Sequence, residues 1–534
     1  MTTTAAAVAK ALAEAGIDRV FGLPGGEVLV LIDECRQVGI DFVLMRHEAN
    51  AGIAAAVHGK LRGQPGVVLA TLGPGAANLM LPIASAYLDQ EPLLAITAQL
   101  PDEFPPSHTH QLLPLHDSYR PICRVAEKVT QANAGELVPR ALAACMERPY
   151  GASFLTLSAR EALKPVTSTT STTPVTPVGP PFMGGRNAIA KAAELRDRLA
   201  RAERPLVLIG LGAGTANAAR IRKWLLEWNL PVAVTPKLKG IVDESSANFV
   251  GVISGMAADG LMVEALKSSD LLIGLGLDPV EIDKLWHTEL PIHWVLEAPN
   301  VGGFIPAGTE LVDHAAFIDA MIAGNAPRVW DQPFETFQRR RRDLLTGQSA
   351  TPETMWPGDI IRALSEAVPA STIVTTDVGS HKYLFGQFWP SRQPGTFWMS
   401  NGLSGMAYGL SAAIGAKLAC PDAPVLAAVG DGGFSMNAQE LETAERVGAP
   451  FVTIVLEDGS YSLIKLAQES RKLPSYRMEF GRIDTVKMAE ACGVQALRTA
   501  HPEELATAVR RAVTERRSLV VGVPVNYADY KLMF

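Results

Sequence analysis

The chain has 534 residues, with 48 Lys and Arg against 55 Asp and Glu and a formal net charge of −7. At roughly 100–200 residues per domain, this length excludes a single small module and predicts about three or four domains. An acidic chain offers no basic surface for a phosphate backbone, which argues against a nucleic-acid partner. Charged residues make up 19% and apolar residues 48%, enough for large cores and for subunit contacts.

The first residues predict a folded helix rather than a targeting segment. Ala5, Val8 and Leu12 have helical spacing behind threonines that can cap a helix, and acidic residues follow. A signal peptide has instead a basic start and a continuous apolar stretch. No apolar run reaches the roughly 18 residues of a membrane span, so no membrane partner is expected. The five cysteines lie far apart without a CxxC pair, which predicts a cytoplasmic protein without a zinc site.

Short apolar runs alternate with helical patterns along the rest of the chain. Each run has the length of a buried strand, and strands alternating with helices are typical of parallel sheets covered on both faces. The sequence therefore predicts an α/β protein made of doubly wound parallel-sheet domains. The runs lie at residues 66–72, 92–97, 205–210, 231–235, 270–276, 371–377, 424–430, 451–456 and 519–525.

Two segments mark expected domain boundaries. A tract of threonine, serine and proline at 164–181 is unable to form a core and predicts an extended linker. Turn-forming residues after the charged segment at 338–343 precede a new helical pattern. We therefore expect a first domain at 1–164, a linker at 165–184, a middle domain at 185–345 and a third domain at 350–534.

The most informative pattern lies in the expected third domain. One predicted strand ends in Gly-Asp-Gly-Gly, residues 430–433, and the next is followed by Asp458. Neighbouring parallel strands bring Asp431 and Asp458 to one edge of a sheet, where carboxylate oxygens suit Mg²⁺ or Ca²⁺. Gly432 and Gly433 lack side chains and let backbone N–H groups approach a phosphate. A metal that bridges the carboxylates and a diphosphate explains this pattern better than two unrelated Asp caps.

This pattern resembles the cofactor-binding signature of the thiamine-diphosphate enzymes, and further segments resemble their acetolactate-synthase branch. The resemblance covers essentially the whole chain. It implies a pyrimidine-binding domain, a middle domain and a diphosphate-binding domain, with thiamine diphosphate and Mg²⁺ as cofactors. The further segments are FGLPGGEV (21–28), RHEANAG (46–52), GPGAAN (73–78), TDVGSH (376–381), SNGLSGMAYGLSAAIGAK (400–417) and VPVNYADYKLM (523–533).

The resemblance implies roles for individual residues. Glu48 matches the catalytic glutamate that hydrogen-bonds the aminopyrimidine ring, and Met406 matches the bulky residue that holds the cofactor bent. From the residues alone, Glu48 is also explained by pairing with Arg46 or His47, and Met406 by core packing. Ser404 stands where the family commonly has a glycine that acts through its backbone carbonyl. The other matches are the cofactor-binding residues Gly379, Ser380, His381, Gly432, Gly433 and Tyr461 and the metal ligands Asp431, Asp458 and Ser460.

Substrate-side residues are expected in the first domain. Gln111 matches a glutamine that faces the reacting carbon in acetolactate synthases, and Gly25 belongs to a loop that faces the same space. His108 and His110 resemble instead the histidines of 2-oxo-acid decarboxylases, and two histidines in a polar loop are also ordinary surface residues. The substrate-side assignment therefore keeps two alternatives open.

Two features bear on a second cofactor. Asp458 and residues 276–283 resemble the catabolic branch of the acetolactate synthases, so FAD is not expected. The glycine-rich turn at 210–214 follows a predicted strand, but the next strand ends in Thr235, where a dinucleotide site needs an acidic residue. We interpret this turn as an empty nucleotide fold.

The activity implied by the resemblance is carboligation. A 2-oxo acid such as pyruvate is decarboxylated and the remaining unit condenses with a second carbonyl compound, which gives 2-acetolactate from two pyruvates. The alternatives are a 2-oxo-acid decarboxylase or an aldehyde ligase or lyase of the same family, and an inactive cofactor-binding subunit. The family also implies that Glu48 of one subunit faces the diphosphate domain of another, in a homodimer or a homotetramer.

Overall fold

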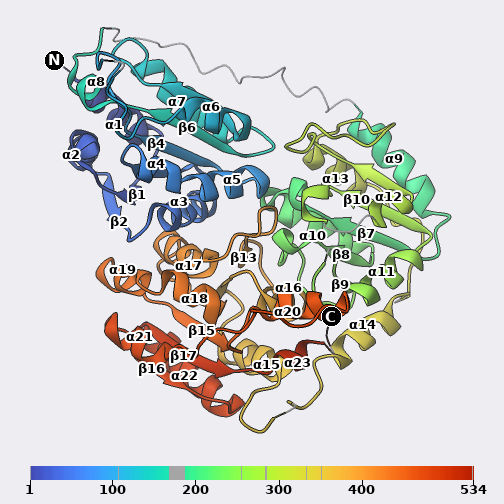
Figure 1. Cartoon of the computed structure of the whole chain (residues 1–534). Helices are drawn as coiled ribbons and strands as arrows, with labels where there is room; N and C mark the ends of the chain where they lie inside the picture. Colours follow the sequence, from blue (N-terminus) through green and yellow to red (C-terminus); the bar gives the residue numbers. More distant parts are fainter. Residues whose placement is uncertain are drawn as a thin grey trace.

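The computed structural model describes residues 2–105, 107–167, 187–253, 255–282, 286–331, 333–349, 351–531 and 533. It contains three parallel β-sheets flanked by helices, one after another along the chain (Figure 1). The expected α/β class with three parallel sheets is confirmed. Most of the expected linker, from residue 168 on, lies outside the described residues, and the domain boundaries stay predictions. In the described ranges no helix is long and apolar enough to cross a membrane.

The first sheet has six strands in the order β2-β1-β3-β4-β6-β5. Its centre, β3 and β4, is fully buried, as expected for the apolar runs at 66–72 and 92–97. The strands are β1 (Arg19–Leu23), β2 (Asp41–Leu44), β3 (Gly66–Ala70), β4 (Leu93–Thr97), β5 (Cys123–Lys128) and β6 (Ala152–Thr156). The helices are α1 (Thr4–Glu14), α2 (Leu29–Gln37), α3 (Glu48–Arg62), α4 (Pro74–Asn78), α5 (Met80–Leu88), α6 (Leu115–Tyr119), α7 (Ala134–Cys145) and α8 (Ala159–Leu163), with the 3-10 turns η1 (Gly26–Val28) and η2 (Arg120–Ile122).

The middle sheet has five strands in the order β11-β10-β7-β8-β9. They are β7 (Pro205–Ile209), β8 (Val232–Val234), β9 (Phe249–Val252), β10 (Leu271–Leu275) and β11 (Ile292–Val295). The helices are α9 (Ala188–Leu199), α10 (Ala218–Glu227), α11 (Asp259–Lys267), α12 (Trp286–Glu289), α13 (His314–Ile322) and α14 (Glu335–Asp343). The 3-10 turns are η4 (Leu211–Ala213), η5 (Thr215–Asn217), η6 (Pro236–Leu238) and η7 (Pro279–Glu281).

The third sheet, β13-β12-β14-β15-β17-β16, repeats the strand order of the first. Its strands are β12 (Ile373–Thr376), β13 (Phe397–Met399), β14 (Val425–Gly430), β15 (Val452–Glu457), β16 (Ala496–Arg498) and β17 (Leu519–Pro524). The helices are α15 (Pro357–Ala367), α16 (Ser380–Phe388), α17 (Tyr408–Ala419), α18 (Asp431–Asn437), α19 (Glu440–Arg446), α20 (Ser462–Ser470), α21 (Thr485–Ala491), α22 (Pro502–Glu515) and α23 (Tyr527–Tyr530).

Helices α3 and α17 join the first and third sheets (Figure 1). Both are rich in small residues, and their backbones come so close that a Cβ on Gly415 would lie 2.2 Å from the carbonyl oxygen of Ala54. Beside them, the buried Glu440 carboxylate accepts hydrogen bonds from Asn50 Nδ2 and the Arg46 N–H. One hydrophobic core therefore runs from the first sheet to the third.

Candidate active site

Two carboxylates meet at the carboxyl edge of the third sheet. Strand β14 pairs with β15 up to its last residue, so Asp431 at the start of α18 and Asp458 after β15 come to the same edge. Asp431 accepts the N–H groups of Gly432 and Gly459 at 2.9 and 2.8 Å. Asp458 accepts the N–H of Ser460 at 3.0 Å and the hydroxyl of Ser462. The structure thus brings together the acidic residues that the sequence spacing singled out.

Both carboxylates are held in an environment that disfavours negative charge. Burial, and then the charge of Asp458, raise the pKa of Asp431 to about 7. Burial likewise raises the pKa of Asp458. A cation placed between the two would remove the repulsion and the cost of desolvation, because it supplies the missing positive charge.

A cavity of about 110 Å³ opens beside these carboxylates. The Oγ atom of Ser380 and the Nε2 atom of His381 are buried there and have no hydrogen-bond partner in the described part of the chain. Burial lowers the pKa of His381 to about 3, so its ring is neutral. Unpaired buried polar atoms are costly and indicate a ligand or water. The lining residues include Gly379, Ser380, His381, Met406, Asp431, Gly432, Gly433, Asp458, Ser460, Tyr461 and Leu463.

The loop between β13 and α17 carries Met406 to the wall of this cavity. Ser404 in the same loop is exposed and does not line the cavity. The loop closes onto Asp377, whose carboxylate accepts the N–H groups of Ala407 and Tyr408 at 3.0 and 3.2 Å. Burial raises the pKa of Asp377 to about 6. Asp377 lies in the motif TDVGSH, and no role was predicted for it, although it is an acidic residue directly after a buried strand.

The catalytic residues predicted in the first domain lie around a second location, the segment 71–75 that follows β3. Glu48, the first residue of α3, is 5% exposed, and its Oε2 accepts a hydrogen bond of 2.9 Å from Asn78. A Cβ on Gly25 would lie 2.4 Å from Thr71 Oγ1, and one on Gly73 would lie 2.8 Å from the Cβ of Gln111. The structure therefore brings Glu48, Gly25 and Gln111 to one edge of the first sheet. His108 and His110 are exposed.

The segment 71–75 of the first domain and the third-domain cavity lie apart within one chain. Every described residue that lines the third-domain cavity comes from positions 378–530, and none belongs to the first domain. The polar contacts of α3 with the third domain run instead through Asn50 to Glu440. Glu48 therefore does not line the cavity that contains Asp431 within one chain.

The glycine-rich turn at 210–214 has a packing explanation. A Cβ on Gly210 would lie 2.5 Å from the Cα of Leu277, and one on Gly276 would lie 2.0 Å from the backbone nitrogen of Ala213. Two loops at the edge of the middle sheet thus touch backbone to backbone, which only glycine permits. A cavity of about 320 Å³ lies next to them, between the middle and first domains.

Comparison with known proteins supports the assignment of all three domains. The N-terminal TPP binding domain of thiamine pyrophosphate enzymes matches residues 2–117, the central domain matches 190–296, and the C-terminal TPP binding domain matches 377–523. The matched C-terminal part contains Asp377, Asp431 and Asp458.

Relatives of similar length are named as acetolactate synthases. "Acetolactate synthase" of Bacillus subtilis is 30% identical over 98% of this chain and 93% of its own length. "Acetolactate synthase, catabolic" of Raoultella terrigena is 28% identical over 97% and 94%. "Acetolactate synthase isozyme 2 large subunit" of Escherichia coli is 30% identical over 86% and 84%. The chain therefore belongs to the thiamine pyrophosphate enzymes and, among them, to the acetolactate synthase-like group.

Proposed function

We propose that the chain is a thiamine-diphosphate-dependent carboligase that decarboxylates a 2-oxo acid such as pyruvate and joins the remaining unit to a second carbonyl compound. The observation that carries this proposal is the third-domain cavity, where two buried carboxylates accompany polar atoms without a protein partner in the described residues. The relatives named acetolactate synthase support 2-acetolactate as the product.

Asp431 and Asp458 fit a divalent cation, which we propose to be Mg²⁺. The described residues contain no group of three or more His, Cys, Asp or Glu suited to a metal, so the other ligands must be oxygens of another kind. The backbone carbonyl of Ser460 and the oxygens of a diphosphate meet this need. Mg²⁺ is suited to such a site, because it typically combines one or two carboxylates with phosphate oxygens and water.

Ser380 and His381 fit the diphosphate of the cofactor, with Gly379, Gly432 and Gly433 allowing its close approach. Ser380 Oγ, which has no partner in the described residues, would donate a hydrogen bond to a phosphate oxygen, and the neutral His381 ring would offer a second polar group. Tyr461, which is 44% exposed, and Met406 also line the cavity and would contact the rest of the cofactor. When bound, thiamine diphosphate supplies the electron-accepting thiazolium ring on which decarboxylation depends.

Glu48 is proposed to hold the proton that the pyrimidine ring exchanges. Its buried carboxyl group has Oε2 fixed by Asn78, which leaves Oε1 to hydrogen-bond the ring. Gln111 and Gly25 border the same edge and are proposed to face the substrate. Substituting Glu48→Gln keeps the shape but removes the transferable proton, so turnover should fall at least about 100-fold, the usual contribution of general acid–base catalysis. Glu136→Gln on the outer helix α7 is the matched control, because Glu136 is exposed there.

We further propose a homodimer, or a homotetramer built from such dimers, in which each site combines Glu48 of one copy with Asp431 of the other. The separation of the two places within one chain supports this arrangement. Large apolar side chains are exposed around both, which fits an interface. They are Met80, Leu81, Leu112, Leu113, Met436, Tyr461 and Ile464.

Subunit complementation tests the shared site. Glu48→Gln and Asp431→Asn variants, each inactive alone, are mixed under conditions that exchange subunits. In a mixed dimer, one of the two sites has both residues intact. When half of the dimers are mixed, about a quarter of the wild-type activity should therefore return. If no activity returns although mixed dimers form, both residues act within one chain and the proposal is wrong.

Product analysis tests the reaction itself. The full-length protein is incubated with thiamine diphosphate, Mg²⁺ and pyruvate, and products are identified by mass spectrometry. Formation of 2-acetolactate supports the carboligase. Acetaldehyde alone would identify a decarboxylase, and the absence of any 2-oxo-acid turnover would identify an inactive cofactor-binding subunit.

We propose that FAD is not needed and that the protein acts in the cytoplasm. The middle-domain cavity is lined by the carboxylates of Asp278 and Glu297, which disfavour a diphosphate. Its cationic side chains already have partners: Arg148 pairs with Glu297, Lys237 pairs with Glu91, and Lys60 donates to the carbonyl oxygen of Gln90. The five cysteines are unpaired, which fits a reducing compartment. Flavin absorbance that co-purifies with active protein would contradict the first statement.

A further inference from the structure

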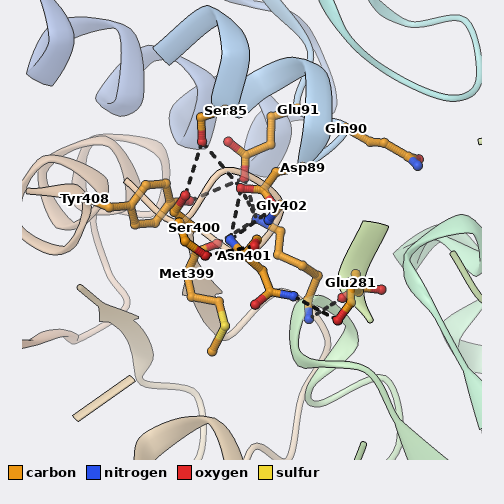
Figure 2. Close-up of polar contacts among 12 residues, drawn as sticks. Ser85, Asp89, Gln90, Glu91, Glu281, Met399, Ser400, Asn401, Gly402 and Tyr408 are labelled. Carbon is orange, nitrogen blue, oxygen red and sulfur yellow. Dashed lines mark hydrogen bonds and ion pairs between the residues drawn. The ribbon is translucent and has the colours of Figure 1, made fainter. Parts of the chain in front are cut away.

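The junction of the three domains contains a cluster of buried charges that the proposed reaction does not use. Asp89 and Glu91, just after α5, are 0% and 1% exposed, although both are acidic. Figure 2 shows them pointing into the junction, whereas Gln90 between them points away. Gln90 instead donates a hydrogen bond of 2.7 Å to Asp278 of the middle domain. Burying two carboxylates is costly unless each has a specific partner.

Lys237 of the middle domain is the positive partner of both acids. Its Nζ lies 2.7 Å from Glu91 Oε1 and 3.8 Å from Asp89 Oδ2. The same Nζ donates to the carbonyl oxygen of Met399, the last residue of β13, at 2.8 Å. One ammonium group therefore connects all three domains.

Asp89 differs from Glu91 in what else it contacts. The Asp89 carboxylate accepts the N–H of Gly402 at 2.8 Å and that of Asn401 at 3.2 Å (Figure 2). Glu91 accepts a hydrogen bond from the Tyr408 hydroxyl at 3.3 Å. In the described residues, Glu91 accepts no hydrogen bond from the backbone of the loop between β13 and α17. Both acids thus pair with Lys237, but Asp89 alone of the two holds the backbone between β13 and α17.

The loop that Asp89 holds is strained. Ser404 and Ala407 have φ values of 56° and 66°, a left-handed conformation that disfavours residues other than glycine. Such strain persists only where the surroundings fix the backbone. Asp377 fixes the far end of the loop through Ala407, and Lys382 Nζ donates to Ser404 Oγ at 3.1 Å.

Gly402 lets the first end of the loop approach Asp89. A Cβ at position 402 would lie 2.7 Å from the Cβ of Leu88, so only glycine brings its N–H up to the end of α5. Met406 follows four residues later in the same loop and lines the cavity.

We propose that Asp89 is a positioning residue for the cofactor: from the first domain, it fixes the backbone of Asn401 and Gly402 and thereby orients Met406 against thiamine diphosphate. The inference rests on the proposed function for the identity of the cofactor. It extends the cofactor-binding machinery to a residue about 300 positions away in the sequence and in a different domain. The competing explanation is that the charges only stabilise the domain junction.

Asp89→Ala and Glu91→Ala separate these explanations, since each removes one carboxylate from the same lysine and only Asp89→Ala also removes the acceptor of the Asn401 and Gly402 N–H groups. Two quantities are measured on the full-length protein: the thiamine diphosphate dissociation constant by equilibrium dialysis with Mg²⁺, and amide hydrogen exchange of residues 399–408 without cofactor. We expect Asp89→Ala to weaken cofactor binding at least tenfold and to speed exchange at Asn401 and Gly402 at least tenfold. Glu91→Ala should change both by less than threefold.

Equal effects of the two substitutions, or no effect of Asp89→Ala, would overturn the proposal. Thermal unfolding of the cofactor-free variants reports their structural stability separately. If Asp89→Ala fails to fold, Gly402→Ala replaces it, because it displaces the same N–H while leaving every charge in place. Gly402→Ala should also weaken cofactor binding at least tenfold, and unchanged binding would refute the positioning role. Failure of the wild type to make 2-acetolactate would refute the proposed function but leave the exchange comparison interpretable.

Discussion

The contact between α3 and α17 gives a prediction in which the usual effect of a substitution is reversed. Gly415 lies inside α17, where Gly→Ala normally stabilises a helix by about 0.5–1 kcal/mol. Here the new Cβ would lie 2.2 Å from the Ala54 oxygen and 2.9 Å from its carbonyl carbon. Both are backbone atoms and cannot rotate away as a side chain can. We therefore expect Gly415→Ala to force the two helices apart and destabilise the protein.

The size of this effect follows from two opposing terms. Overpacking a tight core costs about 1–3 kcal/mol, and contact with rigid backbone places this position at the upper end. Subtracting the helix-propensity gain leaves a net loss of about 2 kcal/mol. For domains of this size the thermal midpoint changes by about 2–4 °C per kcal/mol, so a fall of about 4–8 °C is expected. Because α17 begins just after the Met406 loop, thiamine diphosphate binding should also weaken.

Differential scanning calorimetry of the cofactor-free protein measures the midpoint. Gly135→Ala is the matched control, since Gly135 lies in α7, is exposed, and a Cβ added there would meet no atom of the described chain within 4 Å. That substitution should raise the midpoint by about 1–4 °C. If Gly415→Ala raises the midpoint as Gly135→Ala does, the inferred close approach of the two helices is wrong.

Three further substitutions test other parts of the structure. Lys239→Met leaves the buried Glu244 without the ammonium group that lies 2.5 Å away, and should lower the free energy of unfolding by about 3–5 kcal/mol. The double variant Lys239→Met/Glu244→Gln should recover most of this loss, because no unpaired charge remains buried. Chemical denaturation measures both variants. Burial lowers the pKa of His314 to about 4 from 6.5, so its contribution to stability is complete above pH 6.5 and falls by at most about 3 kcal/mol toward pH 4. His314→Gln should flatten the unfolding free energy over that range, and an unchanged slope contradicts the assignment. Gly433→Ala places a Cβ 2.1 Å from Asp377 Oδ2, the atom that accepts the Ala407 N–H. The substitution should weaken cofactor binding about tenfold or more in a fluorescence titration with Mg²⁺. Wild-type affinity would show instead that Asp377 is free to move.

The central strands were predictable because their burial on both faces demands uninterrupted apolar runs. β3, β4, β7 and β10 coincide with such runs to within a few residues. Strands at the sheet edges were not predicted, and neither were β1 and β6, which lie inside the first sheet. β2 and β16, for example, are only partly buried and short, so their side chains carry no comparable apolar signal.

The two carboxylates of the candidate site could also be predicted from the sequence. Asp431 and Asp458 each follow a buried strand, and parallel pairing of neighbouring strands leaves them no other place than the same edge. The positions of Glu48 and Met406 were inferred from the family resemblance, since a glutamate at a helix start and a lone methionine have many ordinary explanations. The structure places Met406 in the wall of the third-domain cavity, while the role of Glu48 stays a prediction.

The sequence by itself therefore determined the α/β class, most of the central strands and the acidic residues at the ends of two of them, because local periodicity and strand-end position carry that information. Only the tertiary structure decided which distant groups meet. It showed that Glu48 and Asp431 line different places in one chain, and that Asp89 holds the backbone at Gly402. These relations depend on how three sheets pack through α3, α17 and a buried lysine, and no local pattern records the contact of residues hundreds of positions apart.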